Sequence, residues 1–453
     1  MRHWHPERLR DALGWALLTL VSTSTAAAQD FAGREKLRLH GEQEFRKDIV
    51  TVVDGVYVAV GYSMANVTLI VGQSGAIIVD TTSNVDDAQA VKAEFAKISN
   101  APVRAIIYTH AHPDHTGGAS VFAGADRPET YSHQLFVDRV PDLGRAGRDG
   151  GDQFGSTLPE ALYINGGTGT EFGRPLGPAA MKTGPLPPTK TFSGDRLALT
   201  IAGVRLELLH TPGETNDGIS VWLPDTRVLL TGDLFLKAFP NLYAIRGAAP
   251  RPVMTWVGSL TKLIALGAEH VVPGHTRPVL GATNARDALT AYRDGIRSVY
   301  DQTNEGMKRG QRPDELVAHV KLPPHLAGSP YLQEYYGTVE WSVRAIYSDH
   351  LGWFDGNATR LFPMPEVERA KKTVALAGGV QQTLLRGRAA LAEGEFRWAA
   401  ELADCILAGD GGNVDAKRLK AQALTELGER QTSANARNYY LSVAQSLLQG
   451  LPR

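Results

Sequence analysis

The stretch Thr109–Gly118, THAHPDHTGG, places four potential metal ligands within six residues. It directly follows an apolar run, VRAIIY (103–108), that is typical of a buried β-strand. Side chains of an extended segment alternate in direction, so His110 and His112 face the same side and can share one ion. Asp114 and His115 then turn toward a second position. The spacing therefore predicts a two-metal site on a loop between a strand and a helix.

Three more candidate ligands closely follow later apolar runs, each beside a glycine. Glu214 lies in HTPGETND, Asp233 in LLTGDLF and His275 in VVPGHTRP. Loops at strand ends are where a rigid scaffold brings ligands together. A His-rich surface loop that arose by chance is the alternative, and these recurring strand-end candidates argue against it. A single cysteine, Cys405, leaves too few thiolates for a Cys-type cluster, so any metal must be held by histidines and carboxylates.

The chain divides into a β-rich part and a helical part. Turn signals interrupt β-branched runs between Ile49 and Thr82, which predicts successive antiparallel hairpins. Helices are expected over Asp87–Ile98 and Val253–Leu266. The segment Asp138–Lys190 is rich in glycine and proline, and is either a long functional loop or an insertion that folds over a site. Strands are predicted again in four segments: LALTIAGVRLELLHT (197–211), ISVWLP (219–224), RVLLTGDLF (227–235) and HVVPGH (270–275).

After about Asn284 alanine and leucine recur at helical spacing, which predicts a helical second domain. Residues 386–428 have the small-residue and aromatic spacing of paired antiparallel helices, as in tetratricopeptide-type hairpins. One or two such pairs are too few for a solenoid, so packing or dimerisation is the expected use.

Composition excludes several classes of protein. The chain has 453 residues, 43% hydrophobic and 21% charged, which is typical of a globular protein with more than one domain. Lys+Arg 47 against Asp+Glu 48 gives a net charge of -1, so no global positive field exists to hold nucleic acid or an anionic membrane.

Residues 1–28 are predicted to be a secretory signal peptide. Three arginines precede the apolar run WALLTLV (15–21), and the tail STAAAQD (24–30) places cleavage after Ala28. An amphipathic helix is the alternative, because Glu7 and Asp11 dilute the positive region. No window approaches the roughly 18 uninterrupted apolar residues of a membrane span. A periplasmic or secreted protein is expected.

With its strand-end ligands, the sequence resembles the metallo-β-lactamase-fold hydrolases. This resemblance implies an α+β fold, an αβ/βα sandwich with two metals at one edge of its paired sheets. In that superfamily a histidine generally follows Thr-Pro-Gly, whereas Glu214 stands there in this chain. The alkyl sulfatases use glutamate at that place and have a bridging carboxylate 19 residues further on, where this chain has Asp233. That family usually has glutamate at the bridge, so metal spacing or affinity is expected to shift.

The resemblance implies two zinc ions per subunit and a set of roles for the candidate residues. Asp233 is the bridging ligand, and with Asp114 it is one of the expected catalytic carboxylates. Bound zinc lowers the pKa of a coordinated water to about 7 and so provides hydroxide. The ligands implied for the two ions are His110, His112 and Glu214 for one, and Asp114, His115 and His275 for the other.

Asn241 and Arg246, in NLYAIRG, match the sulfate-binding residues of that family by their offsets of 8 and 13 from the bridging carboxylate. Arginine presents a planar fork of donors to a tetrahedral oxyanion. Without the resemblance, Asn241 would be interpreted as a turn residue and Arg246 as part of a surface salt bridge. Of two further residues, His210 is expected to orient the loop of Glu214 rather than bind metal, and Asp80 to fix a ligand imidazole through its other nitrogen.

Two aromatic-rich stretches, EYYGTVEWSVRAIYSDHLGWFDGN (334–357) and RNYYLSV (437–443), resemble the alkyl sulfatase dimerisation domain. Single aromatics there are equally expected in a core. The resemblance covers roughly residues 48–448, with a catalytic domain at 29–285 and a helical dimerisation domain at 286–453. Longer members continue into a sterol-carrier-like domain, so weaker capture of long-chain detergents is expected here.

The expected reaction is hydrolysis of an alkyl sulfate ester to an alcohol and inorganic sulfate, by a homodimer with no nucleic-acid partner. Attack at sulfur and attack at carbon use the same ligands and both stay open, and such a site can also accept manganese or iron. Two other functions are possible. The same fold serves hydrolysis of β-lactams, lactones, thioesters and phosphoesters, and the chain could also be a metal-stabilised scaffold without activity.

Overall fold

The computed structural model describes residues 31–139, 151–159, 162–164, 182–247 and 251–451. The expected signal peptide, residues 1–28, lies outside the described residues, as does much of the Gly/Pro-rich segment 138–190.

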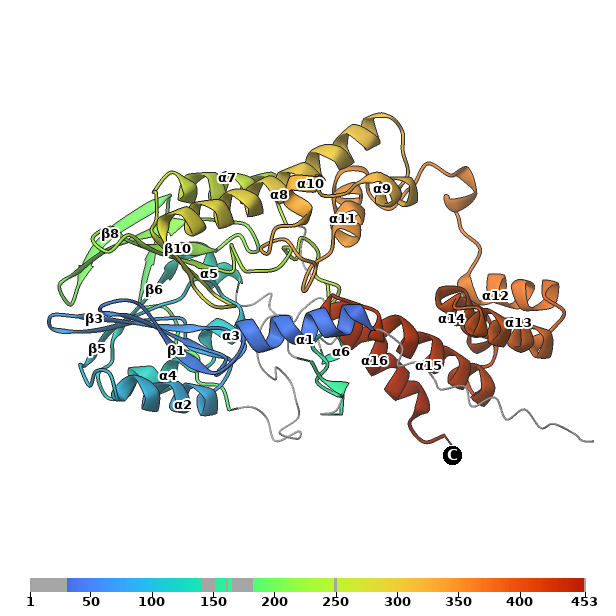
Figure 1. Cartoon of the computed structure of the whole chain (residues 1–453), viewed down its shortest axis with the longest axis horizontal. Helices are drawn as coiled ribbons and strands as arrows, with labels where there is room; N and C mark the ends of the chain where they lie inside the picture. Colours follow the sequence, from blue (N-terminus) through green and yellow to red (C-terminus); the bar gives the residue numbers. More distant parts are fainter. Residues whose placement is uncertain (1–30, 140–150, 160–161, 165–181, 248–250, 452–453) are drawn as a thin grey trace, which may run out of the picture. The chain divides into compact units, whose positions relative to one another are not determined.

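Two β-sheets lie face to face in the first part of the chain (Figure 1). In the first sheet the strands follow the order of the sequence, antiparallel from β1 to β4 and parallel from β4 to β7. Its strands are β1 (Asp48–Val53), β2 (Val56–Val60), β3 (Val67–Gly72), β4 (Gly75–Val79), β5 (Val103–Ile107), β6 (Glu129–His133) and β7 (Lys190–Phe192). The hairpins expected between residues 49 and 82 are confirmed.

The second sheet has the order β13-β12-β11-β10-β9-β8 and is antiparallel except between β11 and β12. Its strands are β8 (Arg196–Ile201), β9 (Val204–His210), β10 (Ile219–Leu223), β11 (Val228–Gly232), β12 (His270–Pro273) and β13 (Val279–Leu280). The four strand segments predicted between residues 197 and 275 lie in this sheet.

Alternation along the central strands divides their side chains between two cores. Ile77 of β4 packs between the sheets, while its neighbour Ile78 packs against the outer helices. Leu229 and Leu230 of β11 divide in the same way. Strands buried on both faces read as continuous apolar runs, which is why these segments were recognisable in the sequence.

Helices cover the outer faces of both sheets. The first sheet is covered by α2 (Val85–Ala96) and α4 (Ala119–Ala123), and the second by α7 (Val253–Ile264) and α8 (Ala282–Lys308). The fold is therefore the αβ/βα sandwich predicted from the sequence. The helix expected from residue 87 begins two residues earlier, because the Asn84 side chain accepts the N–H of Asp87 and caps it.

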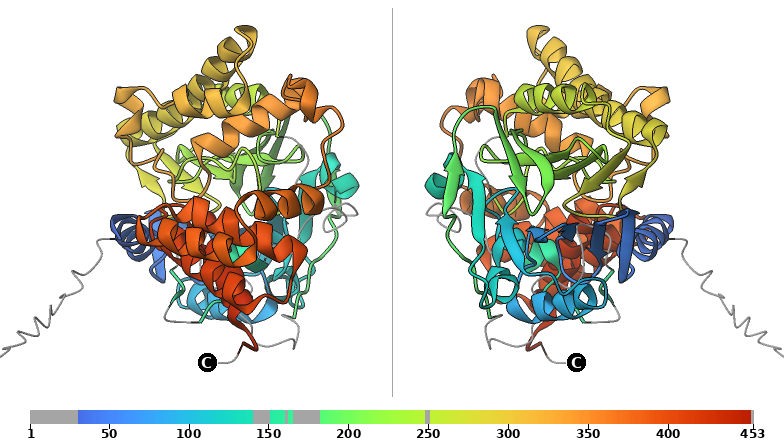
Figure 2. Two further views of the ribbon diagram at one scale, coloured as in Figure 1. Left: turned by 90° about the vertical axis from the view of Figure 1, so that its right-hand side faces the viewer. Right: turned by 90° about the vertical axis from the view of Figure 1, so that its left-hand side faces the viewer.

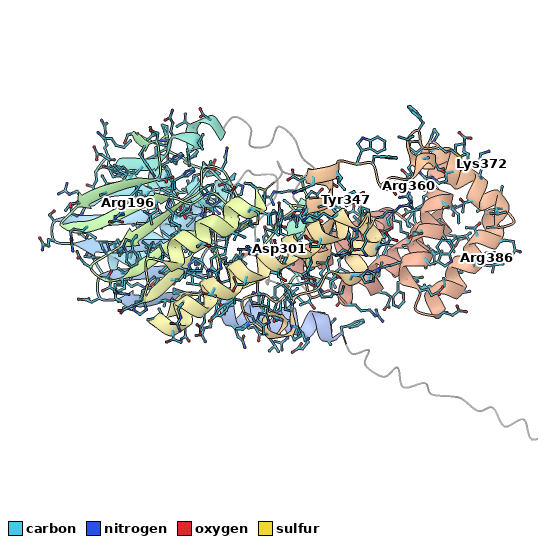
Figure 3. The ribbon with its side chains drawn as sticks, turned by 90° about the horizontal axis from the view of Figure 1, so that it is seen from above. Arg196, Asp301, Tyr347, Arg360, Lys372 and Arg386 are labelled. Atoms are coloured by element: carbon cyan, nitrogen blue, oxygen red, sulfur yellow. The ribbon has the colours of Figure 1, made fainter. Side chains whose placement is uncertain are left out.

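Helices dominate from α8 onward, as predicted. α11 (Val339–Leu351) shares a core with α8; Figure 3 labels Asp301 on α8 and Tyr347 on α11. The later helices pack against one another, mostly each against the next along the chain (Figure 2, left). They are α12 (Glu366–Leu376), α13 (Val380–Ala392), α14 (Phe396–Gly409), α15 (Val414–Glu429) and α16 (Ala434–Leu448). The predicted boundary at 285/286 falls within α8 and stays a prediction.

Several shorter or unexpected elements complete the chain. One long helix, α1 (Ala32–Glu44), has no counterpart in the sequence-based predictions, and its Arg34 pairs with Glu429 at 3.0 Å. Within the described ranges, no helix combines the length and the apolar character that a bilayer crossing requires. The short helices are α3 (Pro113–Thr116), α5 (Gln134–Arg139), α6 (Gly151–Phe154), α9 (Pro313–His319), α10 (Pro324–Ala327) and the 3₁₀ turn η3 (Ala358–Arg360).

Gly118, at the end of the ligand-bearing segment 109–118, packs closely against the end of β4 and against α2. A Cβ there would lie 2.0 Å from the backbone oxygen of Thr81 and 2.5 Å from Cβ of Ala88. We expect Gly118→Ala to destabilise the chain by about 1–3 kcal/mol, since neither neighbour can move without moving backbone. Gly258, an exposed position on α7 with no atom within 4 Å of an added Cβ, is the matched control.

Gly258→Ala should stabilise by about 0.5–1 kcal/mol through its higher helix propensity. Urea unfolding followed by far-UV circular dichroism measures both changes as shifts in midpoint. Equal midpoints for Gly118→Ala and wild type would contradict the tight packing of this segment.

Candidate functional site

Asp80 follows β4 and holds the loop between β5 and α3. Its φ is 58°, a conformation uncommon for a residue other than glycine. Its two carboxylate oxygens accept the backbone N–H and the hydroxyl of Thr109, each at 2.8 Å. Oδ2 of Asp80 also lies 2.7 Å from Nδ1 of His115. The contact fixes the His115 ring and leaves its Nε2 as the nitrogen that can bind a ligand, which is the arrangement expected for Asp80.

The loop after β9 brings Glu214 beside the histidines. Asp217, three residues later, accepts the backbone N–H of Ala111 at 2.8 Å and so ties this loop to THAHPDHTGG. Nε2 of His210 lies 2.8 Å from the backbone oxygen of Asn216. His210 therefore supports the loop, as expected, and lies outside the two groups of candidate ligands.

Asp233 and His275 follow β11 and β12, which are parallel neighbours and so deliver both side chains to the same edge of the sheet. Gly274 permits their close approach, because a Cβ there would lie 2.3 Å from Oδ1 of Asp233. Nδ1 of His275 lies 2.8 Å from the backbone oxygen of Met64, and its Nε2 lies 3.1 Å from Oδ2 of Asp233.

All seven ligand candidates lie in two groups. Within each group, the candidate donor atoms lie within 4.8 Å of one another. Asp233 links the groups: its carboxylate oxygens lie 3.7 Å from Nε2 of His110, 3.3 Å from Nε2 of His115 and 3.1 Å from Nε2 of His275. Asp233 thus stands between the two groups, where the resemblance placed a bridging ligand. The first ligand group is His110, His112, Glu214 and Asp233. The second ligand group is Asp114, His115 and His275.

The buried carboxylates and imidazoles shift one another's pKa values. Burial alone would raise the pKa of Asp233, but His275, His115 and His110 hold it well below its usual range. Burial would lower the pKa of His115 and His275, yet the carboxylates raise both, that of His275 to about 9. The carboxylates therefore favour positive charge on the imidazoles beside them.

The donor set fits a divalent metal cofactor. Nε2 of His115 and Oδ1 of Asp233 are buried 3.3 Å apart, and neither makes a well-aligned hydrogen bond within the described part of the chain. Nε2 of His110 and Nδ1 of His112 lie 2.8 Å apart, as two nitrogens directed at one position would. Imidazole and carboxylate are the ligands of zinc and related metals, and the three carboxylates supply charge that divalent cations neutralise.

Arg251 is a buried partner of Glu214 that no sequence motif signals. Its Nη2 lies 2.8 Å from Oε1 of Glu214, with the two side chains only 4% and 9% exposed. Its Nη1 donates to the backbone oxygen of Asn241. Burial raises the pKa of Glu214 to about 7; the charge of Arg251 opposes this shift and that of Asp233 adds to it. One guanidinium thus connects a ligand candidate to the segment expected to bind sulfate.

Asn241 and Arg246 both carry buried polar atoms that no described residue satisfies. Nδ2 and Oδ1 of Asn241 and Nη1 of Arg246 are buried without a hydrogen-bond partner among the described residues. Arg246 forms no ion pair with another described residue. Its charge helps to lower the pKa of His112, which burial lowers most. An amide and a guanidinium beside the first ligand group suit a tetrahedral oxyanion.

Two family models match the chain. The metallo-β-lactamase superfamily matches residues 60–275, and the alkyl sulfatase dimerisation family matches residues 312–450. A linear primary-alkylsulfatase of a Pseudomonas species is 39% identical over 393 residues, which cover 84% of this chain and 73% of that protein. An alkyl/aryl-sulfatase of Saccharomyces cerevisiae is 29% identical and is covered over 64% of its length, so the chain spans less than two thirds of that relative.

A solved structure shares both the fold and detectable sequence similarity. The stereoselective inverting sec-alkylsulfatase from Pseudomonas is 27% identical, with a TM-score of 0.81 over 92% of this chain and 71% of that one. The match extends through the sandwich and the helices that follow it. Together with the level of identity to the Pseudomonas primary-alkylsulfatase, this agreement decides the family. The chain belongs to the alkylsulfatase family of the metallo-β-lactamase superfamily.

Proposed function

We propose that this chain hydrolyses alkyl sulfate esters to an alcohol and inorganic sulfate, with two zinc ions held by the seven ligand candidates. The observation that carries the proposal is the placement of Asn241 and Arg246, whose buried donors lack partners among the described residues, close to the first ligand group. The relatives named as alkylsulfatases support the same reaction.

In this proposal, His110, His112 and Glu214 hold one ion, Asp114, His115 and His275 hold the other, and Asp233 lies between them. Bound zinc supplies a nucleophile from water at neutral pH and neutralises charge that develops on the ester. The protein's part is to fix the donors: Asp80 orients His115, and the Met64 carbonyl orients His275.

Asn241 and Arg246 bind the sulfate group and hold it beside the ligand groups. Their amide and guanidinium donors are in place before substrate arrives, so they stabilise charge on the sulfate oxygens without reorganising. Asp233 has one methylene fewer than the glutamate usual at the bridge, yet it contacts imidazoles of both groups. A short bridging carboxylate of this kind is compatible with two metals.

The deciding test is a substrate panel with the purified, zinc-loaded chain. We expect sulfate release from a series of alkyl sulfates, including dodecyl sulfate, because the anion seat recognises the group that all of them share. Inorganic sulfate measured by ion chromatography follows the reaction, and comparing chain lengths shows the preferred alkyl group. Turnover of a β-lactam or phosphodiester without sulfate release from any alkyl sulfate would refute the proposal.

Loss of one ligand should separate an enzyme from a metal-stabilised scaffold. We expect His112→Ala to bind about one metal fewer per chain and to lose more than about a hundredfold in kcat/KM. Even residues that only orient a ligand are worth about 10- to 100-fold, so a ligand should be worth more. Elemental analysis and sulfate release measure the two effects.

His325→Ala is the control for that variant, because His325 is exposed and lies outside both ligand groups. It should keep the metal content and rate of the wild type. A scaffold would lose stability in His112→Ala but would have no sulfate release to lose.

We also propose that the chain is a homodimer. Residues 312–450 match the dimerisation family, and four large apolar side chains are exposed between residues 351 and 362. Single exposed apolar residues are normal on a monomer, but a close series of them favours a contact surface. They are Leu351, Trp353, Leu361 and Phe362, which are 52%, 72%, 48% and 95% exposed.

Placing a charge in that series should weaken the dimer. We expect Phe362→Asp to raise the dissociation constant by about tenfold or more, since a buried aromatic anchor is worth about 2 kcal/mol. Leu39→Asp, on α1 and outside the matched residues, is the control at a 43% exposed leucine. Sedimentation velocity over a concentration series measures both. Unchanged dimerisation of Phe362→Asp would remove this segment from the interface.

Export to the periplasm or medium is a further proposal that rests on the sequence alone. It is supported by the arginines, the apolar run 15–21 and the small-residue tail 24–30.

A further inference from the structure

α6 directly contacts Arg246, the arginine proposed to bind sulfate. Gln153 of α6 is fully buried, and its Oε1 accepts the backbone N–H of Arg246 at 3.1 Å. The next residue, Phe154, places its ring centroid 5.7 Å from Cζ of Arg246, within the range of a cation–π interaction. Two consecutive residues therefore contact this arginine, one at its backbone and one at its guanidinium.

The other side of α6 is held by α16. Nδ2 of Asn438 donates to the backbone oxygen of Gln153 at 3.4 Å, across 285 residues of sequence. Gly155, at φ 70°, leaves room for Asn438, because a Cβ there would lie 3.0 Å from its side chain. The neighbour of Asn438, Arg437, donates to the backbone oxygen of Leu162. α16 thus contacts this segment at two places, residues 153–155 and residue 162.

The anchor on α16 is itself buried and paired. Arg437 is 1% exposed, and its Nη2 lies 3.0 Å from Oε1 of Glu429 on α15. Removing water from such a pair is costly, and losing either partner would leave a buried charge unpaired. Arg437 is therefore held in place only together with Glu429. The segment around α6 therefore depends on the packing of the last two helices.

We propose that Gln153 is a positioning residue for Arg246, and that α16 holds Gln153 in place for this task. The inference rests on the proposed role of Arg246 in binding sulfate. An arginine side chain loses substantial rotamer freedom when it binds an anion. Gln153 holds the backbone of Arg246, and Phe154 holds its guanidinium. The side chain is therefore already restricted before substrate arrives, and sulfate binds more tightly because less conformational entropy is lost on binding. The C-terminal helices thereby contribute to substrate affinity as well as to assembly.

The test combines Gln153→Met with Arg246→Met in the full-length, metal-loaded chain. Methionine approximates the size of glutamine but lacks the Oε1 acceptor. We expect Gln153→Met to weaken binding of inorganic sulfate, measured by calorimetry, by about fivefold to tenfold, the effect of one lost hydrogen bond. KM for an alkyl sulfate should rise in parallel, while metal content stays constant and kcat changes by less than about twofold.

The double variant distinguishes positioning from general loosening. If Gln153 acts through Arg246, adding Gln153→Met to Arg246→Met should weaken sulfate binding no further. Additive losses, or wild-type sulfate affinity in Gln153→Met, would overturn the inference. If Arg246→Met itself binds sulfate as wild type does, the proposed sulfate site fails and the inference fails with it. If Arg246→Met loses affinity and Gln153→Met does not, only the inference fails.

A second pair of variants tests the role of α16 and also serves if Gln153→Met does not fold. Asn438→Ala should weaken sulfate binding by about threefold, because the hydrogen bond to Gln153 is long and its loss shifts α6 only partly. The side chain of Asn413, the N-cap of α15, accepts the N–H of Ala416 at 3.0 Å. Asn413→Ala removes this cap and lowers stability without changing a contact to α6. Its sulfate affinity should equal that of the wild type. Equal affinities for Asn438→Ala and Asn413→Ala would overturn the role of α16.

Discussion

The site depends on the carboxylate of Asp233, because this group contacts both ligand groups. It lies between imidazoles of both ligand groups, 3.1–3.7 Å from His110, His115 and His275. So many ionisable groups share a small buried volume only if opposite charges alternate, since an unpaired buried charge costs several kcal/mol. Gly274 makes this closeness possible, because any side chain there would collide with Asp233.

The sandwich explains why these residues can meet. Strands β11 and β12 are parallel neighbours, so the residues that follow them emerge at one edge of the second sheet. The loop after β5 enters the same volume from the first sheet, and Asp80 fixes it there through Thr109 and His115. The ligand candidates lie on loops and short turns that directly follow strands, and the packed strands hold these loops in place.

Two connections extend outward from the ligands to the rest of the chain. Arg251 joins Glu214 to the backbone of Asn241, so one guanidinium links a ligand candidate to a residue proposed to bind sulfate. Gln153 joins Arg246 to α6, and through α6 to α16. The connection through Arg251 is fully buried and the one through Gln153 partly so; hydrogen bonds to charged groups are strong in such places and their loss is costly. The second connection joins α16 to the segment that carries Arg246.

The sequence by itself determined the fold class, the four predicted strand segments of the second sheet and the seven ligand candidates. Apolar runs, and the positions of His110, Glu214 and Asp233 just after such runs, are properties of residues that are close in sequence. They can therefore be recognised from the sequence alone. The tertiary structure alone decided that Arg251 pairs with Glu214, and that Gln153 reaches Arg246 across 93 residues. Neither residue lies in a motif, because these contacts arise from the packing of segments whose separation in sequence carries no record of their distance in space.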